Sequence, residues 1–365
     1  MKKICITGGA GFIGSHLVDY LASKYPQAHL VVVDKMCYPA RREYLEPLLR
    51  SRRATLVEGS ICNSELMNTV LAGADLVIHA AAESHVDNSY RDVKPFIETN
   101  IMGTISVLAA ARQNNVGLFV HVSTDEVYGE SECRNLTVND KLNPTNPYAA
   151  SKAAAEMFVL SYARSYRMRT RITRANNIFG TRQYPEKLIP KLICDALLGN
   201  TFVVHGRGTA FRAFLEVSDF CQAVGAIIDH GEDGGVYNVP AQKEYSVMAV
   251  VEMVSKALGI DVEKFVAFGP DRPHNDCRYG VKGEQLSALG WKPTRLLENE
   301  LSALVDWYKA NLELYSASQQ KDKGAQQRIN RTLKLISGKG VQFNRLRNSR
   351  SNSNLYQFNP QFPSP

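Results

Sequence analysis

The sequence lacks any long hydrophobic run. No segment of its 365 residues approaches the roughly 18 uninterrupted apolar residues that a membrane span requires. The seven cysteines stand singly, with no C-x-x-C pair and an odd total. This pattern suggests neither a disulfide framework nor a zinc knuckle, so we expect no metal site. We expect a protein of the reducing cytosol that has no membrane segment.

Excess positive charge is also absent from most of the chain. The whole sequence carries a net charge of +7, but residues 316–365 hold nine Lys and Arg against one acidic residue. The first 315 residues, with 34 basic and 35 acidic side chains, are nearly neutral. The tail is rich in Ser, Asn and Gln, which is typical of a disordered segment. Because no folded basic face accompanies it, we expect no nucleic-acid partner.

The first half of the chain alternates short apolar runs with helical patterns. The runs are continuously hydrophobic, as strands covered on both faces are, and this predicts a parallel sheet with helices on both sides. They lie at residues 4–6, 30–33, 55–57, 76–78 and 118–122. The predicted fold class is α/β, with a Rossmann-type doubly wound parallel sheet.

The first of these runs is followed by Gly9-Ala10-Gly11-Phe12-Ile13-Gly14, which reads G-x-G-x-x-G and opens a helix. Such glycines allow a tight turn and a close approach of the backbone to a pyrophosphate. Asp34 ends the next strand, 20 residues beyond Gly14, where its carboxylate can accept from ribose hydroxyls and repel a 2′-phosphate. We therefore predict NAD rather than NADP, although Lys35 favours NADP. The alternative is that this glycine-rich segment only makes a turn and binds no cofactor.

Helical patterns divide the rest of the chain. Long helices are predicted from about Val93 to Asn114 and from about Tyr148 to Tyr166, and shorter ones near 186–198, 217–229, 247–258 and 298–312. We predict a NAD-binding domain over 1–175, to which a later segment (about 212–240) can return. Residues 176–315 would form mainly a smaller, mixed substrate-binding domain, and 316–365 the basic tail.

Two groups of side chains suggest chemistry near the fifth strand. Tyr148 and Lys152 lie one helical turn apart, so that the lysine can favour the phenolate of the tyrosine. Thr124, Asp125 and Glu126 follow the strand directly, at the edge where ligands bind. Adjacent acids are usually solvated surface, but two carboxyls in unlike environments can donate and accept protons. Beside a hydride acceptor, this set indicates water elimination coupled to redox.

The chain resembles the nucleotide-sugar 4,6-dehydratases of the extended short-chain dehydrogenase/reductases. The likeness covers about residues 2–314 and is greatest to members that act on dTDP-glucose. The segments that carry it are Thr7–Ser15, Ala81–Asp87, Ser123–Gly129, Pro147–Lys152, Asn176-Asn177, Pro185–Pro190 and Asp271-Arg272-Pro273. The Thr-Asp-Glu segment distinguishes the dehydratases from the sugar 4-epimerases of the same superfamily, because the epimerases usually lack that acid pair.

The resemblance implies a mechanism. Tyr148, aided by Lys152 and Thr124, would remove the 4-hydroxyl proton of a nucleotide-diphosphate glucose while hydride passes from C4 to NAD. Glu126 would then take the C5 proton, and Asp125 would protonate the departing 6-hydroxyl before hydride returns to C6. The family also pairs its two long helices across a two-fold axis, which implies a homodimer.

The resemblance also assigns binding roles residue by residue. The cofactor positions are Gly8, Gly11, Phe12, Ile13, Gly14, Asp34, Lys35, Ile61, Ala80, Ala82, Thr99, Tyr148, Lys152 and Asn177. The substrate positions are Ser84, Thr124, Asn176, Lys187, Leu188, Arg212, Asp271 and Arg272. Three alternatives stay open: UDP-glucose as substrate, a sugar 4-epimerase, and a catalytically silent NAD-binding scaffold.

Overall fold

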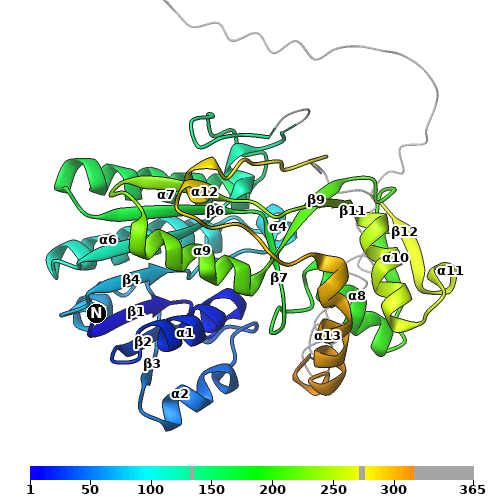
Figure 1. Cartoon of the computed structure of the whole chain (residues 1–365), viewed down its shortest axis with the longest axis horizontal. Helices are drawn as coiled ribbons and strands as arrows, with labels where there is room; N and C mark the ends of the chain where they lie inside the picture. Colours follow the sequence, from blue (N-terminus) through cyan, green and yellow to red (C-terminus); the bar gives the residue numbers. More distant parts are fainter. Residues whose placement is uncertain (132–134, 271–275, 316–365) are drawn as a thin grey trace, which may run out of the picture. The chain divides into compact units, whose positions relative to one another are not determined.

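The computed structural model describes residues 1–131, 135–270 and 276–315 (Figure 1). The basic tail that the sequence predicts to be disordered, residues 316–365, lies outside the described residues. Residues Met1–Tyr315 form one compact unit, and its division into two domains near residue 175 stays a prediction. Among the helices described, none is long and apolar enough to cross a bilayer.

Seven parallel strands form the central sheet, in the order β10-β6-β5-β4-β1-β2-β3. Their bounds are β1 Lys3–Thr7, β2 His29–Asp34, β3 Ala54–Glu58, β4 Leu76–His79, β5 Leu118–Thr124, β6 Thr170–Ala175 and β10 Gly235–Val239. The five predicted strands and the doubly wound parallel architecture are thereby confirmed.

Strand β6 escaped prediction because its sequence, Thr-Arg-Ile-Thr-Arg-Ala, does not look like a buried strand. Both of its arginines are nevertheless buried, since each guanidinium has partners. Arg171 donates to the backbone carbonyls of Ile227 and Ile228. Arg174 forms an ion pair with Glu156, with 2.6 Å between Nη2 and Oε2. A polar strand is thus stable in the middle of the fold.

Helices cover both faces of the central sheet (Figure 1). One face packs against α3 (Ser64–Leu71), α6 (Thr104–Gln113) and α7 (Pro147–Tyr166). The other packs against α1 (Phe12–Lys24), α9 (Val217–His230) and α12 (Glu284–Ala288). This double cover explains the unbroken hydrophobic runs, because neither side of a central strand meets water.

The long helix predicted from Val93 to Asn114 is present over residues 94–113, but it is not α-helical throughout. It consists of α5 (Lys94–Phe96), a π-helical stretch over Ile97–Gly103, and α6. A π-helical turn holds more residues than an α-turn and re-aims its side chains. Here the amide of Asn100, in the middle of that stretch, hydrogen-bonds both the backbone N–H and the carbonyl of Glu83.

Apart from the two hydrophobic layers on the faces of the central sheet, another hydrophobic cluster joins three helices with two small sheets. The helices α8 (Leu188–Leu197), α10 (Val247–Leu258) and α13 (Leu297–Ala310) begin and end within a few residues of the predicted positions. The sheets run β11-β9-β7 and β12-β8. The remaining strands are β7 Asn177–Phe179, β8 Phe202–His205, β9 Phe211–Glu216, β11 Glu244–Ser246 and β12 Val266–Gly269. The remaining helices are α2 Glu46–Arg50, α4 Val86–Arg91 and α11 Val262–Phe265, with 3₁₀ turns at Arg42–Leu45 and, after β5, at Asp125–Tyr128.

Candidate functional site

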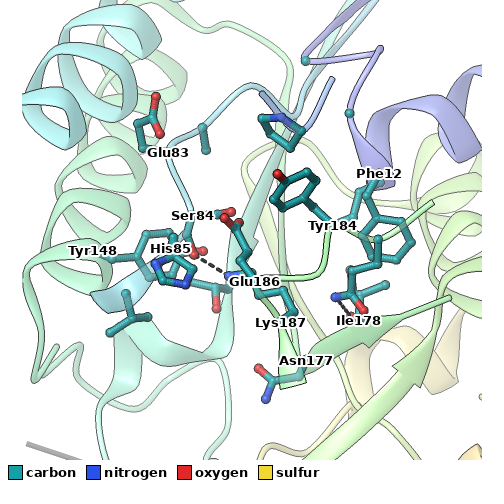
Figure 2. Close-up of a pocket in the computed structure, with 18 of the residues that line it drawn as sticks. Phe12, Glu83, Ser84, His85, Tyr148, Asn177, Ile178, Tyr184, Glu186 and Lys187 are labelled. Carbon is teal, nitrogen blue, oxygen red and sulfur yellow. Dashed lines mark hydrogen bonds between the residues drawn. The ribbon is translucent and has the colours of Figure 1, made fainter. Parts of the chain in front are cut away.

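A cavity of about 480 Å³ lies at the carboxyl ends of the central strands, where doubly wound sheets bind their ligands. Its walls come from the loops after β1, β2, β4 and β5, from the start of α7 and from the residues around β7, β8 and β9. Figure 2 shows Phe12 and Tyr184 on one side and Tyr148 and His85 on the other. The volume is in the range of small-molecule sites.

The cavity brings together nearly all the residues that the sequence assigns to a site, whose roles stay predictions. Asp125 does not line it, and Asp271 and Arg272 lie outside the described residues. The residues that line it are Gly8, Gly11, Phe12, Ile13, Gly14, Asp34, Lys35, Ile61, Ala80, Ala82, Ser84, Thr99, Thr124, Glu126, Tyr148, Lys152, Asn176, Asn177, Lys187, Leu188 and Arg212.

The glycine-rich loop leaves no room for a side chain at Gly8 or at Gly14. Gly8 has a φ of +70°, and a Cβ on it would stand 2.7 Å from the Cα of Ala81. A Cβ on Gly14 would stand 2.0 Å from the carbonyl oxygen of Gly8. Helix α1 begins at Phe12 with no side-chain cap, so its first N–H groups are left to a ligand. This cradle suits the pyrophosphate of a dinucleotide.

Asp34 ends β2 with its carboxylate already oriented. Its Oδ2 accepts from the backbone N–H of Ala10 at 3.0 Å, and its Oδ1 accepts from the N–H of Met36 at 2.9 Å. Each oxygen retains a lone pair beyond these bonds. Since Asp34 lines the cavity next to the glycine-rich loop, the carboxylate is placed to accept from the two hydroxyls of a ribose.

Tyr148 and Lys152 share the first turns of α7, which Asn146 caps by accepting from the N–H of Ala149 at 2.8 Å. The Lys152 ammonium donates to the Val122 carbonyl at 2.7 Å, and burial lowers its pKa to about 8. The Tyr148 hydroxyl is hydrogen-bonded to Thr124. Burial, followed by the charge of Glu126, raises the pKa of Tyr148.

Asp125 and Glu126 leave the 3₁₀ turn after β5 in different directions. Glu126 lines the cavity and accepts from Asn146 Nδ2 at 3.0 Å. Asp125 lies behind the wall, where Thr124 donates to its Oδ1 at 3.2 Å and Asn176 donates to its Oδ2 at 2.6 Å. Burial, then repulsion from Glu126, raises the pKa of Asp125 to about 7. Burial also raises the pKa of Glu126. One acid and one base can therefore coexist near neutral pH.

A buried ion pair fixes the two elements that carry these groups. Glu156 of α7 is fully buried and pairs with Arg174 of β6, which also donates to the Tyr128 hydroxyl at 2.7 Å. Tyr128 in turn donates to Asn238 Oδ1 at 2.8 Å. Because Tyr128 ends the turn that holds Asp125 and α7 holds Tyr148, this network sets their relative positions.

Positive side chains border the other end of the cavity. The Lys187 ammonium donates to the Ser84 carbonyl at 2.6 Å, as the dashed line in Figure 2 shows. The Arg212 guanidinium lies over the Tyr279 ring, 5.0 Å from its centre. A guanidinium and an ammonium that line one cavity and both act on the charge of Glu126 suit a diphosphate, since both donate charge-assisted hydrogen bonds.

Comparison with known proteins decides the family. A family model described as GDP-mannose 4,6 dehydratase matches residues 5–302. The chain belongs to the nucleotide-sugar 4,6-dehydratase family. The resemblance inferred from its motifs, including its place among the extended short-chain dehydrogenase/reductases, is therefore confirmed.

Relatives of this dehydratase-family member differ in length and in name. An Arabidopsis thaliana protein named trifunctional UDP-glucose 4,6-dehydratase/3,5-epimerase/reductase is 41% identical over 86% of the chain, which spans about half (48%) of that relative. The Mus musculus dTDP-D-glucose 4,6-dehydratase is 38% identical over 85% of this chain and 89% of its own. The structure of DesIV, a dTDP-glucose 4,6-dehydratase from Streptomyces venezuelae with NAD bound, superposes with a TM-score of 0.84 at 36% identity, covering 86% of this chain and 99% of that one.

Sequence reasoning missed some residues that line the cavity of this family member. Glu83 lies within one of the family segments, and its carboxylate accepts from Lys35. Asn146 lies just before Pro147, a typical helix-capping signal that identifies it as a cap but not as a partner of Glu126. Tyr279 lies in an irregular segment, where nothing in the sequence marks it.

Proposed function

We propose that this chain is a NAD-dependent dTDP-glucose 4,6-dehydratase, which converts dTDP-glucose to dTDP-4-keto-6-deoxyglucose. The observation that carries the proposal is that Glu126 lines the same cavity as Tyr148 and Lys152. A sugar 4-epimerase needs the tyrosine and the lysine but no base for C5. A silent scaffold has no use for Asp125 with its pKa raised to about 7.

The choice of substrate nucleotide draws support from the relatives. Those named dTDP-D-glucose 4,6-dehydratase match this chain over most of their length, such as 91% for the Homo sapiens protein. The Arabidopsis relatives, named for UDP-glucose, are up to 41% identical, but they are named for further activities as well and match over only 48% of their length. UDP-glucose is therefore the second candidate.

NAD fits the residues that the structure places in the cavity. The glycine-rich loop and the free N–H groups of α1 would hold its pyrophosphate, and Asp34 would hold a ribose. NAD, when bound, supplies the chemistry of accepting a hydride from C4 of the sugar and returning it at C6. The solved structures of relatives that contain NAD, DesIV among them, support this choice.

Tyr148 and Lys152 act in the first half of the reaction. Tyr148 takes the proton of the 4-hydroxyl while that carbon is oxidised. The Lys152 ammonium, one helical turn along α7 from Tyr148, favours the phenolate that this step requires. Lys152 is fixed for this role by the Val122 carbonyl, so it needs no rearrangement.

The acid pair acts in the second half. Glu126 takes the C5 proton, which the new ketone at C4 has made acidic, and Asp125 gives its proton to the 6-hydroxyl, which leaves as water. Because Asp125 lies behind the wall, the proton passes through Thr124, which lines the cavity: its hydroxyl accepts the proton of Asp125 and gives its own hydrogen to the leaving group. Glu126 returns its proton to C5 when C6 is reduced, and the sugar has no net change in oxidation state.

Product analysis tests the proposal. The full chain is incubated separately with dTDP-glucose and UDP-glucose, and the products are identified by mass. We expect the loss of one water from dTDP-glucose and a 4-keto product. Formation of that product only from UDP-glucose would move the assignment to the second candidate. Absence of a 4-keto product with either substrate would refute the proposal.

The activity is expected to peak near neutral pH. Asp125, with a pKa raised to about 7 chiefly by burial, loses the proton it must donate as the pH rises. Lys152, with a pKa lowered by burial to about 8, loses its charge at a slightly higher pH. On the acid side, burial raises the pKa of Glu126, so its basic form is lost as the pH falls through that raised value. Initial rates give kcat/KM against pH, and a profile flat through the alkaline range would contradict these roles.

We also propose a homodimer through the face formed by the π-helical stretch, α6 and α7. Large apolar side chains are exposed on and beside these elements, and such a patch marks an interaction surface. A second copy of the same face would cover both patches at once. The exposed side chains are Val93, Ile97, Met102, Met157, Phe158 and Tyr166.

Light scattering tests the dimer. The wild-type chain is expected at twice its 40.6 kDa mass. Replacing Met157 and Phe158 together with lysine should give the monomer, because two charges would be buried in each interface. The matched control is Phe268→Lys, since Phe268 is 63% exposed on β12, away from this face. A monomeric wild type, or an unaffected double variant, would contradict the proposed interface.

We propose a cytosolic location for the enzyme. Six cysteines lie among the described residues, and all six are free. Cys5, Cys194 and Cys221 are buried, and burial raises the pKa of each thiol, which makes it unreactive. Thiols of this kind persist in a reducing compartment.

The partner that the proposed reaction requires is a nucleotide sugar, which is the substrate.

A further inference from the structure

Lys35 presents a conflict with the proposed use of NAD. A lysine directly after the ribose-binding acid is a candidate partner for a 2′-phosphate, and this would favour NADP. Lys35 does line the cavity, beside Asp34. The question is whether its ammonium is available to a ligand.

The three N–H donors of the Lys35 ammonium already have three acceptors. The carboxylate of Glu83, which is partly buried, accepts from the Lys35 ammonium at 2.6 Å. The Thr99 hydroxyl lies at 3.5 Å, and the Cys37 side chain is a further hydrogen-bond partner. A phosphate would have to displace Glu83, a charged partner, to reach this lysine.

Glu83 is itself held in place by buried groups. Asn100 is 1% exposed, and its side chain accepts from the Glu83 N–H at 2.8 Å and donates to the Glu83 carbonyl at 3.0 Å. The same Asn100 amide also donates to Ser151 of α7 at 2.8 Å. In Figure 2 the Glu83 carboxylate points away from Lys187 and the substrate end of the cavity. The two bonds with Asn100 fix the backbone of Glu83, and its carboxylate is bonded to Lys35.

We propose that Glu83 is a cofactor-specificity residue, which holds the Lys35 ammonium and so withholds it from a 2′-phosphate. Asp34 repels that phosphate directly, and Glu83 removes the neighbouring cation that could offset the repulsion. The Lys35–Glu83 pair contributes no net charge to this part of the site. The inference deepens the proposed function, because it rests on the use of NAD.

Nucleotide binding to the full chain, stripped of any bound nucleotide, tests this role. Glu83→Ala is expected to tighten NADPH binding by about tenfold, the effect of one charge-assisted contact, and to leave NADH binding within about threefold. Glu83→Gln keeps an acceptor for Lys35 and should give a smaller gain. Calorimetric titration with NADH and NADPH measures both affinities without turnover.

Two controls separate specificity from loss of charge or of structure. Glu58→Ala removes a carboxylate from the strand position beside Asp34 without touching Lys35, and should leave the NADPH/NADH ratio unchanged. Lys35→Met combined with Glu83→Ala should abolish the gain. The proposal is overturned if the ratio is unchanged in both Glu83 variants, if both nucleotides weaken together, or if the double variant keeps the gain.

This test is independent of the proposed reaction. A wild-type chain that yields no 4-keto product, but whose preference for NADH relaxes in Glu83→Ala, would refute the dehydratase and retain the role of Glu83. A wild-type chain that forms the product but binds NADPH as tightly as NADH would do the reverse.

Discussion

Replacing Tyr148 with phenylalanine is expected to lower kcat for 4-keto product formation by about 10²–10⁴-fold, the contribution of one positioned proton-transfer group. The hydroxyl is buried beside Thr124, and phenylalanine removes that oxygen without changing the packing of the ring. Because the first step would then lack its base, mixing with substrate should give no absorbance of reduced nicotinamide.

Tyr20→Phe is the matched control for this change. Tyr20 has the same four-residue spacing to a lysine, Lys24, but it lies on α1 with its hydroxyl against Gly225 of α9. We expect the control to keep kcat within about twofold, as is usual for a substitution away from a site. A Tyr148→Phe variant that retained more than about a tenth of the activity would exclude Tyr148 as the base.

The central sheet could be predicted because its strands are buried on both faces. Strands β1, β2, β4 and β5 are continuous apolar runs, and that pattern survives without knowledge of the tertiary structure. Strand β6 could not be predicted in this way. Its arginines are buried only because Glu156 and two helix carbonyls lie opposite them, and these partners are far away in the sequence.

The sequence predicts which residues lie at the candidate site, but it does not predict which of their side chains point into the cavity. The end of β5 fixes where Asp125 and Glu126 lie, since ligands bind at that edge of a parallel sheet. Which of the two side chains enters the cavity depends on the 3₁₀ turn and on Asn176, which holds Asp125 behind the wall. The partner of Lys35 was also hidden, because the π-helical stretch that holds Glu83 looks like ordinary helix in the sequence.

Glu126→Gln is expected to lower product formation by about 10²–10³-fold while sparing the first half of the reaction. The amide can still accept from Asn146 Nδ2 through its carbonyl oxygen, so the cavity should keep its shape. It cannot take a proton from C5. Stopped-flow mixing with substrate should therefore show the absorbance of reduced nicotinamide rise and then persist, since the oxidised sugar has no base to carry it onward.

The persistence of the reduced-nicotinamide absorbance distinguishes the role of Glu126 from that of Tyr148. In Tyr148→Phe the signal should be absent, and in Glu126→Gln it should be present but trapped, because one lacks the base for the 4-hydroxyl and the other the base for C5. Glu130→Gln is the control, since it removes a nearby carboxylate that does not line the cavity. Equal turnover of Glu126→Gln and the wild type would favour a 4-epimerase, which passes through the same oxidised sugar but never breaks the bond at C5.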